Sequence, residues 1–195
     1  MDKVLMFDLG GVLVMNDMFE ALPKLIEDEI EAEKLRAKWL QSPAVRQFEL
    51  GICSPQEFSS SMVEEFGLSA TPGEFMAAFS GWPKGFYPGV EELISDLRKR
   101  FTTGCLSNSN EAHWTTKVTS HFDHSYSSHL LKRIKPDVEV FEFVTSDIGC
   151  RPDEVVFFDD SQLNVDAARA FGWEAHLTVG FTEVKRVLKR VGAIR

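Results

Sequence analysis

Four short runs of apolar residues lie along the chain, and the first three of them stop at a polar residue. The runs are KVLMFD at 3–8, TTGCLSN at 102–108, VVFFDD at 155–160 and EAHLTV at 174–179. Short runs rich in β-branched and aromatic residues predict strands. Because the apolar character is nearly continuous, we expect strands that are buried on both faces of a sheet.

Helix-like segments separate these predicted strands. They are residues 89–100, 136–149 and 164–172. Strands that alternate with helices predict a parallel sheet covered on both faces, so the fold class is α/β, with a three-layer α/β/α Rossmann-like core. Ligands of such sheets bind beyond the carboxyl ends of the strands. Three polar groups are therefore expected to meet at one point, namely Asp8, Ser107–Asn108 and Asp159–Asp160.

Residues 16–84 follow a different pattern, in which no strand is predicted. The predicted helices there are residues 17–40, 54–67 and 71–79. Ser54, with Glu57 three residues later, is a typical helix start signal. The glycines and prolines of GWPKGFYPG, at 81–89, predict a linker that returns to the sheet. We therefore predict a helical cap over residues 16–84, inserted into a core made of residues 1–15 and 85–195.

Composition and charge limit the classes of molecule that the protein is expected to bind. Hydrophobic residues make up 44% and charged residues 26% of the 195 residues, as in ordinary globular proteins. The formal net charge of −9 disfavours nucleic acid and anionic membranes as partners, although a metal ion and local cations can still hold an anionic small molecule. Three widely spaced cysteines predict reduced thiols. With no bilayer-spanning run and no signal-peptide pattern at the start, we expect a cytoplasmic protein.

The polar strand ends belong to four short motifs that occur in a recognisable order. These are FDLGGVL with Asp8, CLSNSN with Ser107, RIKPD with Lys135, and VFFDDSQLN with Asp159 and Asp160. In order and spacing they resemble the four motifs of the haloacid dehalogenase-like hydrolase superfamily, including a helical cap after the first motif. LSNSN, KPD and FFDDSQLNVDAA are similar, more narrowly, to bacterial phosphatases that act on glucose 1-phosphate.

The resemblance implies a phosphatase mechanism and its residues. Asp8 is implied to attack phosphorus and form an aspartyl-phosphate, which divides hydrolysis into two easier steps. Mg²⁺ would offset the repulsion between carboxylate and phosphate. The implied Mg²⁺ ligands are the Asp8 side chain, the Gly10 carbonyl, Asp160, and Asp159 directly or through water. The groups implied to hold the phosphate are the Ser107 hydroxyl, the Asn108 backbone N–H and Lys135, which also holds the nucleophile.

Gly10 departs from the usual superfamily pattern. Most phosphatases that the motifs resemble carry an aspartate there, which protonates the leaving oxygen. Three explanations stay open, and we favour the first. The substrate has a weakly basic leaving group, such as that of a sugar 1-phosphate or an acyl phosphate, and needs little help from an acid. Alternatively, another residue supplies the proton, or the protein mainly binds a ligand or partner. The candidates for a substitute group are His113, Asn16, Asp17 and Glu49.

Substrate selection is assigned to the cap and to the loop after the second motif. Glu49 and Gly51 form an acid–x–Gly turn similar to one in the related phosphatases, so Glu49 is predicted to bind substrate. His113 is a second predicted substrate contact, and Lys117 a weaker candidate. Trp114 is better explained by packing.

The predicted function is a Mg²⁺-dependent phosphatase of a small phosphorylated metabolite, such as a sugar phosphate. One alternative is a 2-haloacid dehalogenase, which would also use Asp8 but needs no metal, so the adjacent Asp159 and Asp160 argue against it. The other is a non-catalytic binding protein, which only Gly10 favours. The oligomeric state is left open.

Overall fold

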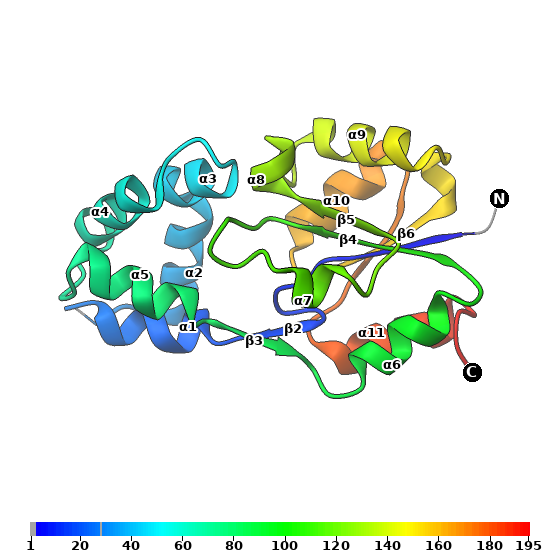
Figure 1. The fold of residues 1–195 in the computed structure, drawn as a ribbon, viewed down its shortest axis with the longest axis horizontal. Coiled ribbons are helices and arrows are strands. Elements are labelled where there is room, and N and C mark those ends of the chain that lie inside the picture. The colour runs from blue at the N-terminus through cyan, green and yellow to red at the C-terminus, as the bar shows by residue number, and fades with distance from the viewer. Residues whose placement is uncertain (1–2, 28) are drawn as a thin grey trace.

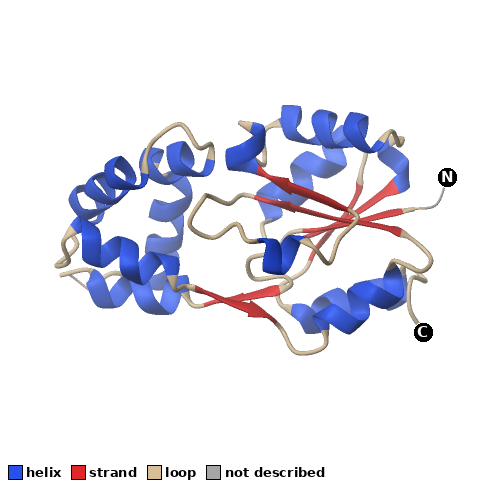
Figure 2. Cartoon of the chain, in the orientation of Figure 1, coloured by secondary structure: helices blue, strands red, loops and turns tan. Residues whose placement is uncertain are grey.

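A five-stranded sheet lies at the centre of the protein. The computed structural model describes residues 3–27 and 29–195; residues 1–2 of the predicted core and residue 28 of the predicted helix 17–40 lie outside the described residues. The strand order is β5-β4-β1-β6-β7, and all neighbouring strands are parallel (Figures 1 and 2). The strands are β1 Val4–Phe7, β4 Thr102–Ser107, β5 His124–Ser127, β6 Val155–Asp159 and β7 Glu174–Leu177.

Helices cover both faces of this sheet. The first face carries α6 (Val90–Leu97) and α11 (Phe181–Arg190), and the second carries α9 (Val138–Ile148) and α10 (Gln162–Phe171). Side chains alternate along a strand, so Leu5 and Phe7 of β1 pack on the first face while Val4 and Met6 pack on the second. The predicted three-layer α/β/α core is therefore confirmed.

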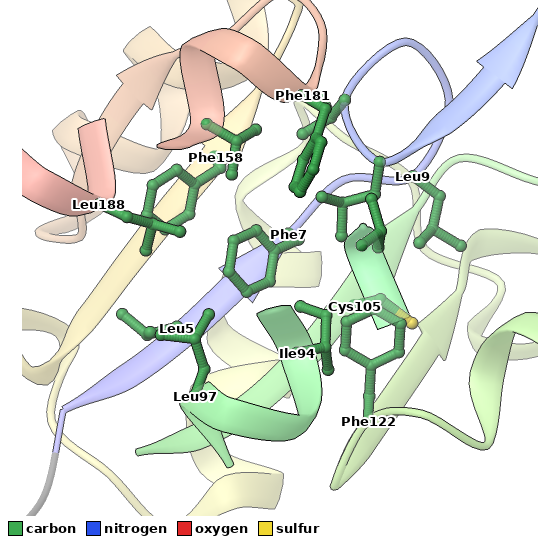
Figure 3. Close-up of a cluster of buried hydrophobic side chains, with 14 of the residues drawn as sticks. Leu5, Phe7, Leu9, Ile94, Leu97, Cys105, Phe122, Phe158, Phe181 and Leu188 are labelled. Atoms are coloured by element: carbon green, nitrogen blue, oxygen red, sulfur yellow. The ribbon is translucent and has the colours of Figure 1, made fainter. Parts of the chain in front are cut away.

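Aromatic rings fill the first of these interfaces. Phe7 of β1 stacks on Phe158 of β6 with the ring centroids 4.7 Å apart. Figure 3 shows this pair between Leu5 and Leu97 on one side and Phe181 on the other. Both rings are fully buried. Burial of such side chains stabilises the fold by roughly 1.5–3 kcal/mol each, so the core holds the strand ends in fixed positions.

A bundle of helices lies beside the sheet and encloses a separate hydrophobic cluster (Figure 1). Its elements are α1 Met18–Ala21, the 3₁₀ helix η1 Leu22–Leu25, α2 Ala32–Gln41, α3 Pro43–Glu49, α4 Pro55–Phe66 and α5 Pro72–Ser80. Ser54 and Glu57 form the capping box that starts α4, and Thr71 and Glu74 form another at α5. The long predicted helix 17–40 is wrong as one element, since it divides into α1, η1 and α2.

Two short strands connect the bundle to the sheet. β2 (Val14–Asn16) and β3 (Pro83–Phe86) pair antiparallel, with a register shift between Met15 and Asn16 (Figure 2). The prediction of a plain linker at 81–89 and of no strand in 16–84 is wrong here. Gly85 adopts a φ of 93°, which glycine tolerates and which suits the irregular pairing. The predicted boundary between residues 84 and 85 falls inside β3.

Several short elements were not predicted. They are β5, α7 Thr116–Thr119, α8 Ser128–Leu131 and the 3₁₀ helix η2 Pro152–Glu154. β5 reads HSYS, a sequence too short and too polar to stand out. Among residues 3–27 and 29–195, no helix combines the length and the apolar character that crossing a membrane requires.

Candidate active site

Three neighbouring strands bring polar residues to one edge of the sheet. Asp8 follows β1 directly, Ser107 is the last residue of β4, and Asp159 is the last residue of β6. β1 lies between β4 and β6, and all three run in the same direction. Their carboxyl ends therefore meet, as is usual for ligand sites in parallel sheets.

Lys135 ties these strand ends together from the loop before α9. Its side chain is 1% exposed, and Nζ donates to Asp8 Oδ1 at 2.7 Å, Asp159 Oδ2 at 2.6 Å and the Leu106 carbonyl at 2.9 Å. Burial disfavours the ammonium, but the two carboxylates outweigh it and raise the pKa of Lys135. An ammonium has three N–H donors, and all three are used within the protein. Lys135 thus holds the nucleophile candidate by hydrogen bonding and offers a phosphate its charge.

Asp8 is buried, yet one of its oxygens is available. Lys135 binds Oδ1, whereas Oδ2 accepts no hydrogen bond within the described residues. Burial raises the pKa of Asp8 to about 7; Asp159 and Asp160 add to the rise, and Lys135 opposes it. The carboxylate is therefore oriented at one oxygen and open at the other, as a nucleophile requires.

Asp159 is enclosed by donors. Oδ2 accepts from Lys135, the Ser161 backbone N–H donates to Oδ1 at 2.8 Å, and Asn164 Nδ2 lies 3.0 and 3.2 Å from the two oxygens. The residue has no solvent exposure. These contacts hold Lys135 in place, and the role of Asp159 as a metal ligand, directly or through water, stays a prediction. Asn164 was not singled out from the sequence; its only signal was a position in the first turn of the helix after the Asp–Asp pair.

Asp160 packs against the glycine turn after β1. A Cβ on Gly11 would lie 2.6 Å from Asp160 Oδ2, and Gly11 has a φ of 73°. Both facts require glycine at position 11. Burial raises the pKa of Asp160 to about 6, with Asp159 adding to the rise. The surroundings of Asp160 therefore disfavour its ionised form.

The donor set suits Mg²⁺. Among residues 3–27 and 29–195, no group of three or more His, Cys, Asp or Glu side chains is arranged around a metal position, and Lys135 separates Asp159 from Asp8. Mg²⁺ commonly takes only one or two carboxylates, completing its shell with waters and phosphate oxygens. Asp8, Asp160 and the Gly10 carbonyl are all oxygen donors. Burial is the main cause of the raised pKa values of both acids, with neighbouring carboxylates adding to it, and a bound cation would stabilise their ionised forms.

Ser107 and Asn108 have different environments. The Ser107 hydroxyl makes no hydrogen bond within the described residues, and the residue lines a cavity of about 630 Å³. The Asn108 side chain is engaged: Nδ2 donates to the Lys135 carbonyl at 2.9 Å, and Oδ1 accepts from the Lys135 N–H at 3.0 Å. Asn108 therefore positions the Lys135 loop, a role that its sequence neighbourhood did not indicate.

Glu49 comes to the site from the cap. It ends α3, and its carboxylate lies within electrostatic reach of Lys135 and Arg46. Burial nevertheless raises the pKa of Glu49 to about 7. Its carbonyl accepts a hydrogen bond from the Ser128 hydroxyl at 2.6 Å, so the turn is fastened to the core at α8. The structure thus brings Glu49 to the same edge as Lys135.

His113 is held by the protein on both sides of its ring. Nε2 lies 2.8 Å from the Phe79 carbonyl and Nδ1 lies 3.4 Å from Asn110 Nδ2, which is the pattern of a neutral ring that donates from Nε2. The ring stacks on Phe79 at 4.2 Å, and burial lowers its pKa. His113 lines the cavity, but these contacts leave no nitrogen for proton transfer.

Comparison with known proteins identifies the family. Residues 3–172 match the haloacid dehalogenase-like hydrolase family. This match spans most of the chain, so the protein belongs to that family, and the prediction of a hydrolase of this kind is confirmed. The narrower resemblance to glucose-1-phosphate phosphatases stays a prediction.

Relatives of nearly the same length are similar to it. The chain is 28% identical over 190 residues to D-ribitol-5-phosphate phosphatase of Bacteroides thetaiotaomicron, covering 89% of this chain and 90% of the relative. It is 27% identical over 203 residues to a sesquiterpene phosphatase of Aspergillus oryzae, covering 97% of each. Among solved structures, a haloacid dehalogenase family enzyme of B. thetaiotaomicron, in complex with magnesium and inorganic phosphate, superimposes with a TM-score of 0.69 at 26% identity, covering 90% of this chain and 93% of that one.

Proposed function

We propose that the protein is a Mg²⁺-dependent phosphatase that hydrolyses a small phosphorylated metabolite through an aspartyl-phosphate. The observation that carries the proposal is the state of Asp8, whose Oδ1 is fixed by Lys135 while Oδ2 accepts no hydrogen bond within the described residues. A carboxylate held at one oxygen, with the other oxygen unbonded, suits nucleophilic attack on phosphorus. Membership of a hydrolase family with phosphatase relatives supports the reaction type.

The contacts of the surrounding residues support a role for each. Lys135 favours the ionised form of Asp8 and holds it in place, and Asp159 with Asn164 holds Lys135 in place. The free Ser107 hydroxyl is suited to donate to a phosphate oxygen. When bound by Asp8, Asp160 and the Gly10 carbonyl, Mg²⁺ would supply positive charge to the phosphate. The magnesium and phosphate complex of the B. thetaiotaomicron enzyme supports this assignment.

The substrate is proposed to be the phosphate monoester of a small alcohol, with sugar phosphates as the leading class. The cavity of about 630 Å³ joins Ser107 and Gly10 to the pair β2–β3, which is space for a leaving group of metabolite size. Glu49 is proposed to select the substrate from the cap side, which its electrostatic contact with Lys135 supports. The relatives named for D-ribitol 5-phosphate and for sesquiterpenes indicate that alcohols of quite different polarity should be included in a screen.

A screen of phosphorylated metabolites with Mg²⁺, and again with a chelator, tests the proposal. We expect phosphate release that is lost with the chelator and restored by added Mg²⁺. Asp160→Asn should shift the Mg²⁺ concentration needed for half-maximal activity upward by tenfold or more, since one anionic ligand is removed. Chelator-resistant chloride release from 2-haloacids would favour the dehalogenase alternative. The absence of both activities would favour a binding protein.

A further inference from the structure

Gly10 leaves open space two residues after Asp8, although the backbone conformation there does not require a glycine. Its φ is not positive, and a Cβ placed on it would meet only Asn16 Nδ2, at 3.9 Å. Gly11 is the opposite case, with a positive φ and a Cβ position 2.6 Å from Asp160. The space at Gly10 opens into the cavity that Ser107 and Asn16 also line. A group of the substrate that enters the cavity can therefore approach the backbone at Gly10, two residues after Asp8.

Asn16 faces this space with a defined end of its amide. It is the last residue of β2, at the register shift against β3. Its Oδ1 accepts a hydrogen bond from the Met18 backbone N–H at 2.8 Å. Since an N–H can donate only to the oxygen, this bond assigns the two ends of the amide. Nδ2 then lies toward Gly10, and within residues 3–27 and 29–195 it donates to no partner.

Two other candidates for a substitute acid are less suited to this task. Both ring nitrogens of His113 have partners in the protein. Asp17 Oδ2 is paired with Lys84 at 3.0 Å, and its Oδ1 is buried without a hydrogen-bond partner among the described residues. Of Asn16, Asp17 and His113, Asn16 is therefore the one with an unpaired donor close to the Cβ position of Gly10.

We infer that the Asn16 side-chain amide donates a hydrogen bond to the leaving-group oxygen of the substrate, and so replaces an acid that position 10 cannot supply. The inference rests on the proposed phosphatase function. As Asp8 Oδ2 bonds to phosphorus, the bond from phosphorus to the leaving oxygen breaks and its electron pair stays on that oxygen. The amide stabilises this developing charge and keeps its own protons. The alkoxide takes a proton from solvent water, and the hydroxide so formed is consumed when the aspartyl-phosphate is hydrolysed to phosphate and the free Asp8 carboxylate.

A neutral donor of this kind stabilises charge without transferring a proton. Removal of one such donor typically costs about 10²–10³-fold in rate. The loss grows with the charge that the leaving oxygen carries. It should therefore be large for alkyl phosphates and small for aryl phosphates such as 4-nitrophenyl phosphate, whose leaving group is stable as an anion.

Asn16→Asp and Asn16→Leu test the inference. Asn16→Asp keeps the oxygen that binds the Met18 N–H but loses the donor, whereas Asn16→Leu has similar size and no charge. For both variants we expect kcat/KM to fall about 10²-fold on an alkyl phosphate and by less than about threefold on 4-nitrophenyl phosphate. The ratio of the two substrates is the readout, because repulsion of the shared phosphate by a new carboxylate cancels in it.

A pH profile adds a second measurement. Protonation of the new carboxyl in Asn16→Asp restores a donor, so its alkyl-to-aryl activity ratio should rise as the pH falls, and that of Asn16→Leu should not. An equal loss on both substrates would overturn the inference in favour of a structural role, and an unchanged kcat/KM on both substrates would overturn it outright. If the wild-type protein releases phosphate from neither substrate class, the proposed function itself is refuted and this inference falls with it.

Discussion

The ion pairs on the sheet side of the site are buried, whereas the ion pair on the cap side is exposed to solvent. On the sheet side, Lys135 pairs with Asp8 and Asp159, and the three side chains are 1%, 10% and 0% exposed. On the cap side, Arg46 pairs with Asp137 of the core, and both side chains are nearly half exposed. Buried pairs are costly to break, whereas exposed pairs contribute little. The reacting groups are therefore held firmly and the cap is held loosely.

This difference suits two separate tasks: the sheet side holds the reacting groups, and the cap opens to admit substrate. The contacts that fasten the cap include Lys132 Nζ to the Gly51 carbonyl at 2.5 Å, which is exposed, and two part-buried ones, the Ser128 hydroxyl to the Glu49 carbonyl and His113 Nε2 to the Phe79 carbonyl. Contacts of this kind can be exchanged for water when a cap opens to admit substrate. The network around Lys135 can stay intact throughout, because none of its members belongs to the cap.

Asp8→Asn should have the largest effect. The amide keeps the shape of the side chain but cannot attack phosphorus, so we expect kcat to fall by at least about 10³-fold. Phosphate release measures the loss, and circular dichroism should show an unchanged fold. Activity within tenfold of the wild type would contradict the assignment of Asp8 as nucleophile.

Lys135→Met tests how strongly the buried ion pairs of the sheet side stabilise the fold. Removal of the ammonium leaves two buried carboxylates without their cation, which should lower the free energy of unfolding by about 3–5 kcal/mol. Arg46→Gln is the matched change on the cap side and should cost less than about 1 kcal/mol. Urea denaturation measures both. Equal decreases in the free energy of unfolding for the two variants would contradict the difference between the buried and the exposed ion pairs.

Gly10→Asp probes the open space between the two sides. Position 10 has room for a side chain and no positive φ, so the variant should fold normally. A carboxyl there can act as a general acid, and we expect kcat/KM on alkyl phosphates to rise about tenfold, a conservative part of the gain that acid catalysis usually supplies. Gly11→Asp is the control, and we expect it to disrupt the site and lose activity, because its Cβ would collide with Asp160. Reduced alkyl activity in a well-folded Gly10→Asp variant would argue against the need for an added acid.

Glu49→Gln should produce the smallest effect, and it concerns pH. The pKa of Glu49 is raised to about 7 in the folded protein from an ordinary value of 4.5. Ionisation is thus harder in the folded state, so the wild type loses stability as the pH rises from about 4.5 to 7. Glu49→Gln removes this loss, and relative to the wild type it should gain about 1 kcal/mol between pH 5 and pH 8, less than the full shift because the side chain is partly exposed. Thermal melts at both pH values measure it; an identical pH dependence would contradict it.

The elements with strong local signals could be predicted from the sequence. β1, β4, β6 and β7 are short apolar runs, and the capping boxes at Ser54 and Thr71 mark α4 and α5. β5 and the pair β2–β3 escaped prediction, because their stability comes from pairing with distant strands rather than from their own residues. The same limit applies to Asn164 and to the Asn108 side chain, whose partners lie on other loops.

The sequence by itself determined which residue types stand at the carboxyl ends of the strands, and hence that Asp8, Ser107 and Asp159 would meet. Strand direction and hydrophobic pattern are local properties, and they were sufficient for that conclusion. Only the tertiary structure decided how the charges are shared: that Lys135 uses its three donors on the protein, that Asp159 faces Lys135, and that Asn16 opens toward the space at Gly10. Hydrogen-bond partners and side-chain directions depend on distances between segments far apart in the chain, and no pattern along the sequence records those distances.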